Sequence, residues 1–170
     1  MKIYHRLFSF GGVLSLSRIW YNTPILNRLG HKAMIIEIEG RHKHKDVVNV
    51  YLGNLCRSLK LNRLQRVILI KFKSRLDNDA QGLCEGEESY AQISIGTKNA
   101  PFLLQMQALA HEMVHAKQFL RGELTSIGVF KWKGRNAENY AYINQPWEKE
   151  AYRMERELFL DCFPFEMYDA

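Results

Sequence analysis

The chain has 170 residues, of which 46% are hydrophobic and 25% are charged. This length fits one domain with its own core and the composition excludes a disordered chain, so we expect a single domain spanning residues 1–170. The net charge of +6 permits attraction to an acidic partner but does not by itself indicate nucleic-acid binding. The three cysteines, Cys56, Cys84 and Cys162, form no CxxC pair, which favours reduced thiols in a cytoplasmic protein.

The first 30 residues show no sustained hydrophobic period and are interrupted by Gly11-Gly12 and Pro24. We expect a short strand or hairpin and a helical turn here. Basic residues precede the apolar stretch 7–16 in the order of a signal peptide, but no A-x-A cleavage pattern follows. No apolar run reaches the roughly 18 residues of a membrane span, so we expect neither export nor a membrane partner.

A strand and an amphipathic helix are expected next. Residues 33–39 read as a strand that ends at Gly40, and the basic run 41–45 forms a turn. His42 and His44 in this run invite a metal or phosphate site, but the flanking cations favour a solvated turn. Asp46 is a candidate N-cap for the helix that follows. The apolar stripe of this helix consists of Val48, Tyr51, Leu52, Leu55 and Leu59.

Three further strands are expected before the central helix. Residues 66–73 contain a short β-branched run typical of a buried strand, and residues 80–85 and 89–97 form two strands joined by an acidic turn. Ala91, Ile93 and Ile95 alternate with polar residues, so we expect one buried face and a place at the edge of the sheet. Cys84 offers a thiolate to a metal but is more typical of a small buried side chain.

The central helix is predicted over residues 101–120, with Thr97 or Asn99 as its cap and Gly122 just beyond its end. It contains an HExxH motif, His111-Glu112-Met113-Val114-His115. Positions i and i+4 share one helix face, so both imidazoles can reach one metal ion. Glu112 projects about 100° further round and can serve as general base for a water bound to zinc. The alternative is a solvated polar face, but the apolar sequence around the motif favours a core or cleft.

Residues 121–145 are rich in glycine, asparagine and aromatic residues, and we expect mostly irregular chain that forms one wall of a cleft. A last helix begins at Pro146. Its inward stripe consists of Trp147, Ala151, Met154 and Leu158. Glu148 and Glu150 flank this stripe on opposite sides, so either can reach the metal as third ligand.

The order of these elements predicts an α+β fold. We expect a small, mostly antiparallel sheet of three to five strands packed on helices. The HExxH helix and the C-terminal glutamate-bearing helix then form the metal cleft.

Two stretches, Ala110–Gln118 and Pro146–Tyr152, resemble the compact gluzincin-type zinc metallopeptidases. The likeness is to SprT-like proteins and to small HExxH proteins encoded by tailed phages. It implies a site-bearing part at about residues 80–165 and a Zn²⁺ cofactor. In several of these families the ligand glutamate stands three residues before an alanine, which implies Glu148, with Glu150 as second choice. Tyr152 stands where these families often have an acidic residue or asparagine.

The same resemblance implies zinc-dependent hydrolysis of peptide bonds in a protein or peptide substrate, with the zinc-bound water activated by Glu112. Tyr140 or Tyr142 is the implied residue for holding the oxyanion. One alternative is a zinc-stabilised binding or virion structural protein without catalysis. Another is an amidase acting on cell-wall peptides at the same site.

A nucleic-acid partner is the remaining expectation to weigh, because SprT-like relatives act on DNA-bound proteins. The densest basic group lies beside the run 41–45 and consists of Arg57, Lys60, Arg63, Lys71, Lys73 and Arg75. A solvated helix and strand end explains this group equally well. DNA binding would require affinity that falls steeply with added salt.

Overall fold

The computed structural model describes residues 22–24, 34–40, 42–98 and 100–169. The helical turn expected among the first 30 residues lies outside this part of the chain, which includes only residues 22–24 of that stretch. Within the described residues, no helix combines the length and the apolar character needed to cross a membrane.

A five-stranded sheet forms the base of the fold, in the order β1-β2-β3-β5-β4. The strands are β1 (Asn22–Pro24), β2 (Ile35–Glu39), β3 (Val67–Lys73), β4 (Gly82–Gly86) and β5 (Tyr90–Gly96). A short 3₁₀ turn, η1 (Asp77–Asp79), precedes β4. The four strands expected at residues 33–39, 66–73, 80–85 and 89–97 are therefore present, within two residues of their predicted bounds.

The pairing in this sheet is mixed, whereas a mostly antiparallel sheet was expected. The β2–β3 and β3–β5 pairs are parallel, whereas β1–β2 and β4–β5 are antiparallel. The reason lies between β2 and β3, where helix α1 (Lys45–Ser58) carries the chain back along the sheet. A strand that follows such a helical crossover runs parallel to the strand before it.

The described sheet ends in β1 on one side and in β4 on the other, so the predicted edge position of residues 89–97 was wrong. Strand β5 lies between β3 and β4. Ala91, Ile93 and Ile95 are fully buried, so their alternation marks the face of a central strand that packs on the core. An alternation of apolar and polar residues therefore indicates that one face of a strand is buried. It does not distinguish an edge strand from an inner one.

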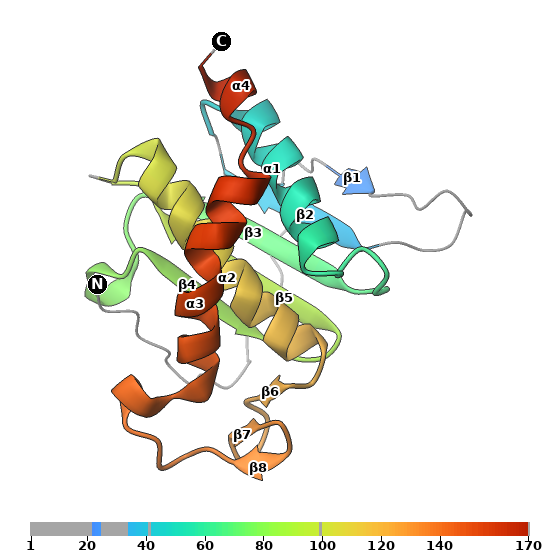
Figure 1. The fold of residues 1–170 in the computed structure, drawn as a ribbon, viewed down its shortest axis with the longest axis vertical. Coiled ribbons are helices and arrows are strands. Elements are labelled where there is room, and N and C mark those ends of the chain that lie inside the picture. The colour runs from blue at the N-terminus through green and yellow to red at the C-terminus, as the bar shows by residue number, and fades with distance from the viewer. Residues whose placement is uncertain (1–21, 25–33, 41, 99, 170) are drawn as a thin grey trace.

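Helices α1, α2 (Phe102–Leu120) and α3 (Pro146–Cys162) lie on one side of the sheet, which confirms the α+β fold class (Figure 1). The short α4 (Phe165–Tyr168) follows α3. Helix α2 packs against β4 and β5 and is crossed by α3, and every residue from 108 to 120 is buried. Because α2 is covered on both sides, the polar residues of the HExxH motif lie in the interior.

The helix ends differ from the predicted caps. Helix α1 begins two residues earlier than expected, with His44 at the N-cap. Asp46 lies in the first turn, where the helix dipole stabilises a carboxylate. Helix α2 has Pro101 at its N-cap. Thr97 instead donates its hydroxyl to the Lys73 carbonyl at 3.1 Å, and Asn99 lies outside the described residues.

Residues 121–145 contain more regular structure than expected. Gly122, with φ of +66°, ends α2 in a Schellman turn, in which its N–H bonds to the Phe119 carbonyl and that of Glu123 to the Gln118 carbonyl. A small antiparallel sheet follows, formed by β6 (Leu124–Thr125), β7 (Lys131–Trp132) and β8 (Arg135–Asn136). A 3₁₀ turn, η2 (Tyr142–Asn144), then leads into α3.

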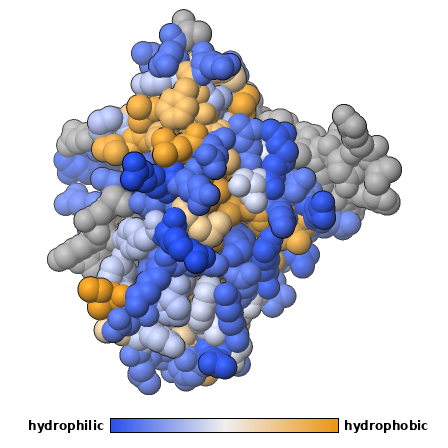
Figure 2. Space-filling view, viewed as in Figure 1, coloured by the Kyte–Doolittle hydropathy of each residue, from blue (hydrophilic) through white to orange (hydrophobic). Residues whose placement is uncertain are grey.

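Polar side chains cover most of the face that carries the helices (Figure 2). An apolar patch near the top of this view lies around the end of α3 and α4, where Leu160, Phe165 and Met167 are exposed.

Candidate metal centre

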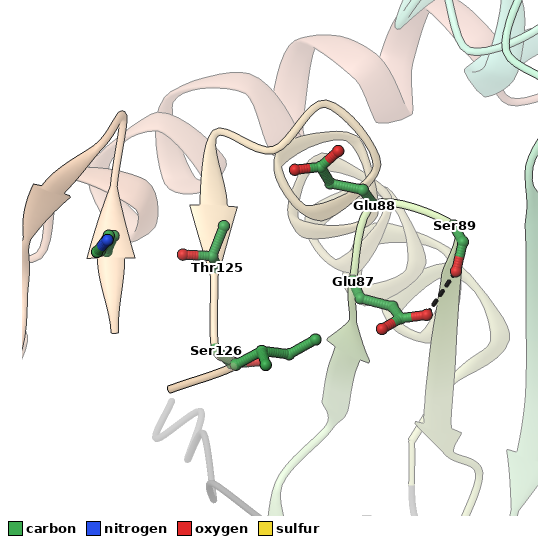
Figure 3. A pocket seen from close by; sticks show the side chains of 7 residues that line it. Glu87, Glu88, Ser89, Thr125 and Ser126 are labelled. Atoms are coloured by element: carbon green, nitrogen blue, oxygen red, sulfur yellow. Dashed lines mark hydrogen bonds between the residues drawn. The ribbon is translucent and has the colours of Figure 1, made fainter. Parts of the chain in front are cut away.

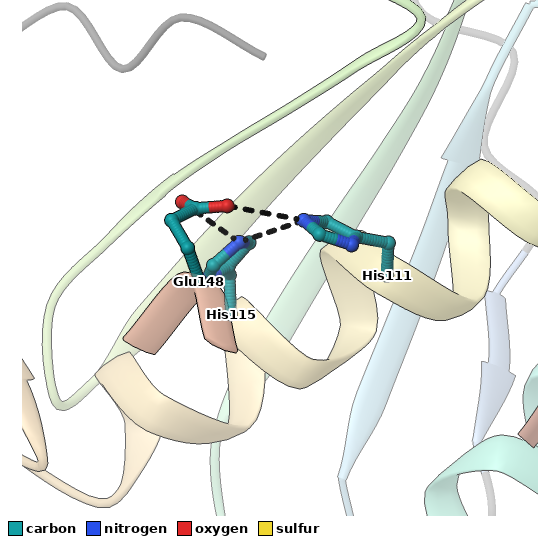
Figure 4. A group of neighbouring side chains, drawn as sticks. All are labelled: His111, His115 and Glu148. Carbon is teal, nitrogen blue, oxygen red and sulfur yellow. Dashed lines mark hydrogen bonds and ion pairs between the residues drawn. The ribbon is translucent and has the colours of Figure 1, made fainter. Parts of the chain in front are cut away.

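Three side chains from two helices converge beneath the crossing of α2 and α3. His111 and His115 come from successive turns of α2, and Glu148 comes from the first turn of α3 (Figure 4). The Nε2 atoms of the two histidines are 3.1 Å apart. The Glu148 carboxylate lies 3.5 Å from Nε2 of His111 and 3.4 Å from Nε2 of His115. All three side chains are buried, and together they form a group that could bind a metal ion.

The spacing of these atoms fits a single ion. Two ligand atoms at 2.0–2.1 Å from a tetrahedral metal lie about 3.3 Å from each other. The two Nε2 atoms lie 3.1 Å apart, and each lies 3.4–3.5 Å from a different oxygen of the Glu148 carboxylate. These separations are close to that value, so the two imidazoles and the carboxylate could hold one ion together.

The hydrogen bonds of Gln118 determine which nitrogen of His115 faces the group. Nε2 of Gln118 donates to the Trp147 carbonyl at 3.0 Å and to Glu150 at 2.7 Å, so its Oε1 is available as an acceptor. That oxygen lies 2.8 Å from Nδ1 of His115. His115 therefore carries its proton on Nδ1 and directs the Nε2 lone pair toward the group.

At Nδ1, where His115 has the Gln118 amide oxygen, His111 has a carboxylate. Its Nδ1 lies 2.7 Å from Oε2 of Glu155, whose other oxygen accepts a bond from Gln107. Burial alone would lower the pKa of His111, but hydrogen bonds with Glu148 and Glu155 and the charge of Glu112 raise it to about 9. With Nδ1 donating to Glu155, the Nε2 lone pair of neutral His111 also faces the group. Two imidazole lone pairs and a carboxylate directed at one point require a cation there, either a proton or a metal ion.

Glu112 lies against the edge strand β4. It is buried, and a methyl group built on Gly82 would lie only 2.5 Å from its Oε1. Gly82 therefore leaves the space that the Glu112 carboxylate occupies. Cys84, on the same face of β4, is also buried, and burial followed by the charges of Glu112 and Glu85 raises its thiol pKa well above the ordinary value. Cys84 is accordingly a neutral buried thiol and is not part of the metal group.

Glu150, the second choice for the third ligand, has different partners. It accepts hydrogen bonds from Lys117 at 3.1 Å and from Gln118 at 2.7 Å. Burial would raise the pKa of Glu150, but these two donors lower it overall. Glu150 thus fixes α3 against α2, while Glu148 lies with the histidines.

Trp147, the residue before Glu148, holds the start of α3 in place. Trp147 is 2% exposed, and its ring is surrounded by Phe130 at 5.0 Å, Trp132 at 6.1 Å and Tyr140 at 5.9 Å. The segment between α2 and α3, expected to be a wall of the cleft, therefore packs around the start of α3. This packing fixes the position of Glu148.

The two tyrosines predicted to hold an oxyanion lie in different places. Tyr140 packs against Trp147, whereas the Tyr142 hydroxyl lies 3.3 Å from the hydroxyl of Tyr152. The Tyr152 ring in turn makes an edge contact with His111, with centroids 4.7 Å apart. Burial and the carboxylates of Glu148, Glu155 and Glu112 raise the pKa of Tyr152, although its bond to Tyr142 lowers it.

Sequence reasoning missed four residues of this centre, namely Gln118, Glu155, Gly82 and Tyr152. Gln118 and His115 are three residues apart, and Glu155 and Glu148 are seven apart, so each pair shares a helix face. These spacings were a usable signal. No local signal connects Gly82 with Glu112, because their contact depends on how β4 packs against α2.

A separate shallow pocket of about 420 Å³ lies at the turn between β4 and β5 (Figure 3). It is lined by Glu87, Glu88, Ser89, Thr125, Ser126, Ile127 and Lys131. None of these residues belongs to the metal group.

Comparisons with protein-family models, with curated proteins and with solved structures found no match to this chain.

Proposed function

We propose that this chain is a zinc-dependent hydrolase of peptide bonds, similar to the compact gluzincin-type metallopeptidases. One observation carries the proposal: His111, His115 and Glu148 converge from α2 and α3, with the Glu112 carboxylate buried on the next position of the same helix. Two imidazoles and one carboxylate form the ligand set of catalytic zinc sites that leave a fourth position open. Zinc held by these residues would polarise a carbonyl group and make a water molecule more acidic.

Glu112 is the proposed general base. Its carboxylate accepts a proton from the attacking water as the new C–O bond forms, and it delivers that proton to the amine nitrogen when the C–N bond breaks. The close approach of Gly82 holds this carboxylate against β4. Glu155 and Gln118 hold the two imidazoles in the tautomer that binds a metal through Nε2.

The outer edge of β4, which pairs with no further strand among the residues that the structure describes, is the proposed binding place for an extended substrate. Gln81 and Glu87 form hydrogen bonds with β5 or its flanking residues, so the alternate residues, Gly82 and Cys84, direct their backbone groups away from it. The outward carbonyl of Gly86 accepts a hydrogen bond from the Ser126 hydroxyl at 3.4 Å. An extended peptide can pair with such an edge through main-chain hydrogen bonds. Residues 89–97, which were expected at an edge of the sheet, cannot take this role because β4 covers them.

The proposal is tested by metal content and peptide cleavage. Protein purified without added metal should contain close to one zinc per chain, and His115→Ala should lose it. Zinc-loaded protein should cleave an unfolded protein substrate such as reduced casein, and Glu112→Gln should lower the rate about 100-fold or more while retaining zinc.

The controls separate catalysis from a structural role. Glu150→Gln removes a nearby carboxylate outside the metal group and should retain zinc. If the wild-type protein binds zinc but cleaves nothing, and Glu112→Gln is equally stable, the zinc is structural and the peptidase proposal is wrong. If the wild-type protein binds no metal, the proposal fails at its first step.

A further inference from the structure

The metal group is buried, but one aromatic residue connects it with the surface. His111 and His115 have no exposed surface and Glu148 is 2% exposed, whereas Tyr152 is 38% exposed. The edge contact between the rings of Tyr152 and His111 places this tyrosine directly beside a metal-binding imidazole. Tyr152 therefore stands at the border between the group and solvent.

The position of Tyr152 on α3 explains this placement. Glu148, Tyr152 and Glu155 occur at positions i, i+4 and i+7, which share one face of a helix. The outer two meet the histidines directly, through the contacts of Glu148 with both rings and of Glu155 with His111. Tyr152 lies between them, so its side chain belongs to the same face.

The Tyr152 hydroxyl has a partner from a separate element. Tyr142, on η2, places its hydroxyl 3.3 Å from that of Tyr152. Each hydroxyl can donate one hydrogen bond and accept others. When Tyr142 donates to Tyr152, the proton of Tyr152 remains available for a third group, and the first bond strengthens Tyr152 as a donor.

We propose that Tyr152 donates a hydrogen bond to the oxygen of a carbonyl group bound at the metal centre, with Tyr142 as its positioning residue. This inference rests on the proposed function, because it requires a metal-bound carbonyl ligand. It assigns the oxygen-binding role to Tyr152, on the glutamate-bearing helix, and gives Tyr142 a supporting one. No proton is transferred, because the hydroxyl stabilises charge on the oxygen through the hydrogen bond alone.

The test measures ligand binding to the zinc-loaded protein by calorimetry. Acetohydroxamate binds zinc and presents a carbonyl oxygen, whereas 2-mercaptoethanol binds zinc through sulfur and presents none. Tyr152→Phe should weaken acetohydroxamate binding about tenfold or more and leave 2-mercaptoethanol binding unchanged. Tyr142→Phe should weaken acetohydroxamate binding less, and Tyr140→Phe, which alters a tyrosine beside Trp147, should have no effect.

Each outcome decides the inference. Equal acetohydroxamate affinity in the wild-type protein and Tyr152→Phe overturns it, even if peptide cleavage upholds the proposed function. Equal losses for both probes also overturn it, because the substitution then disturbs the zinc site itself. A selective loss for acetohydroxamate in a protein that cleaves no peptide upholds the inference while the proposed function fails. A wild-type protein without zinc overturns both.

Discussion

At the scale of single residues, the two histidines of the metal group differ in the partner of Nδ1. His111 faces the Glu155 carboxylate, whereas His115 faces the Gln118 amide oxygen. A carboxylate stabilises a positively charged imidazole more strongly than an amide does. His111 is therefore the position at which a proton competes with a metal ion.

This competition predicts the pH dependence of the metal-free protein. The pKa of His111 is raised from 6.5 to about 9, so the stability that its proton contributes is fully present below pH 6.5 and is lost as the pH rises through 9. Zinc must displace the same proton, so its apparent affinity should fall at least about tenfold for each pH unit below 9. Ring NMR signals of metal-free protein would report the titration directly.

Glu155→Gln is the matched variant for this prediction. It removes one of the carboxylates that raise the pKa of His111 and should move its titration to lower pH. The loss of a partner to a ligand histidine typically weakens metal binding about 10–100-fold. A His111 ring that titrates near 6.5 in the wild-type protein would contradict the assignment.

Part of this centre can be predicted at the residue scale. His111 and His115 follow from helix periodicity alone, because their meeting requires only one helix. Glu148 and Glu150 could not be separated on geometry, because both flank the inward stripe of α3 and the choice depends on the crossing with α2. The resemblance favoured Glu148, and the structure places Glu148 with the histidines and Glu150 with Lys117.

At the scale of elements, strand β4 and helix α2 meet at Gly82 and Glu112. A methyl group at Gly82 would come within 2.5–2.9 Å of three atoms of the Glu112 side chain. Such distances are too short for contact, so the carboxylate must move away from β4. The strand therefore sets the position of the proposed general base.

Gly82→Ala should lower peptide cleavage about tenfold or more and leave zinc content unchanged, because the ligands face α3 and the base faces β4. Cleavage rates and metal content measured on the same preparation test this prediction. Gly53→Ala is the control, since nothing lies within 4 Å of a methyl group at that helical position. Unchanged cleavage in Gly82→Ala would mean that the position of Glu112 does not matter for activity.

The sequence predicted which segments form helices and strands better than it predicted which strands lie side by side. Hydrophobic periodicity is local, so it correctly predicted the three long helices and strands β2 to β5, whereas the short strands β6 to β8 were not predicted. Strand order and direction depend on contacts between distant segments. The parallel β2–β3 pair was nevertheless deducible, because a helix of 14 residues lies between them and a tight hairpin was therefore excluded.

At the scale of the whole molecule, the metal group connects two elements with separate supports. Helix α2 is held by the main sheet, through its contacts with β4 and β5. The start of α3 is held by the segment between the helices, through Phe130, Trp132 and Tyr140 around Trp147. A metal bound by His111, His115 and Glu148 would join these two parts across the helix crossing.

Removal of the metal should therefore lower the free energy of unfolding. It should also increase local opening of the segment that leads into α3 more than local opening of the main sheet. A ligand at about 1,000 times its dissociation constant stabilises the folded state by about 4 kcal/mol, so chelation should lower the unfolding temperature by several degrees. Amide exchange should increase in residues 121–150, while α1, β2 and β3, which contain no ligand, should stay protected. His115→Ala should show the lower stability from the start and no response to chelator. If the wild-type protein unfolded at the same temperature and exchanged at the same rates with and without zinc, the three side chains would be ordinary buried residues.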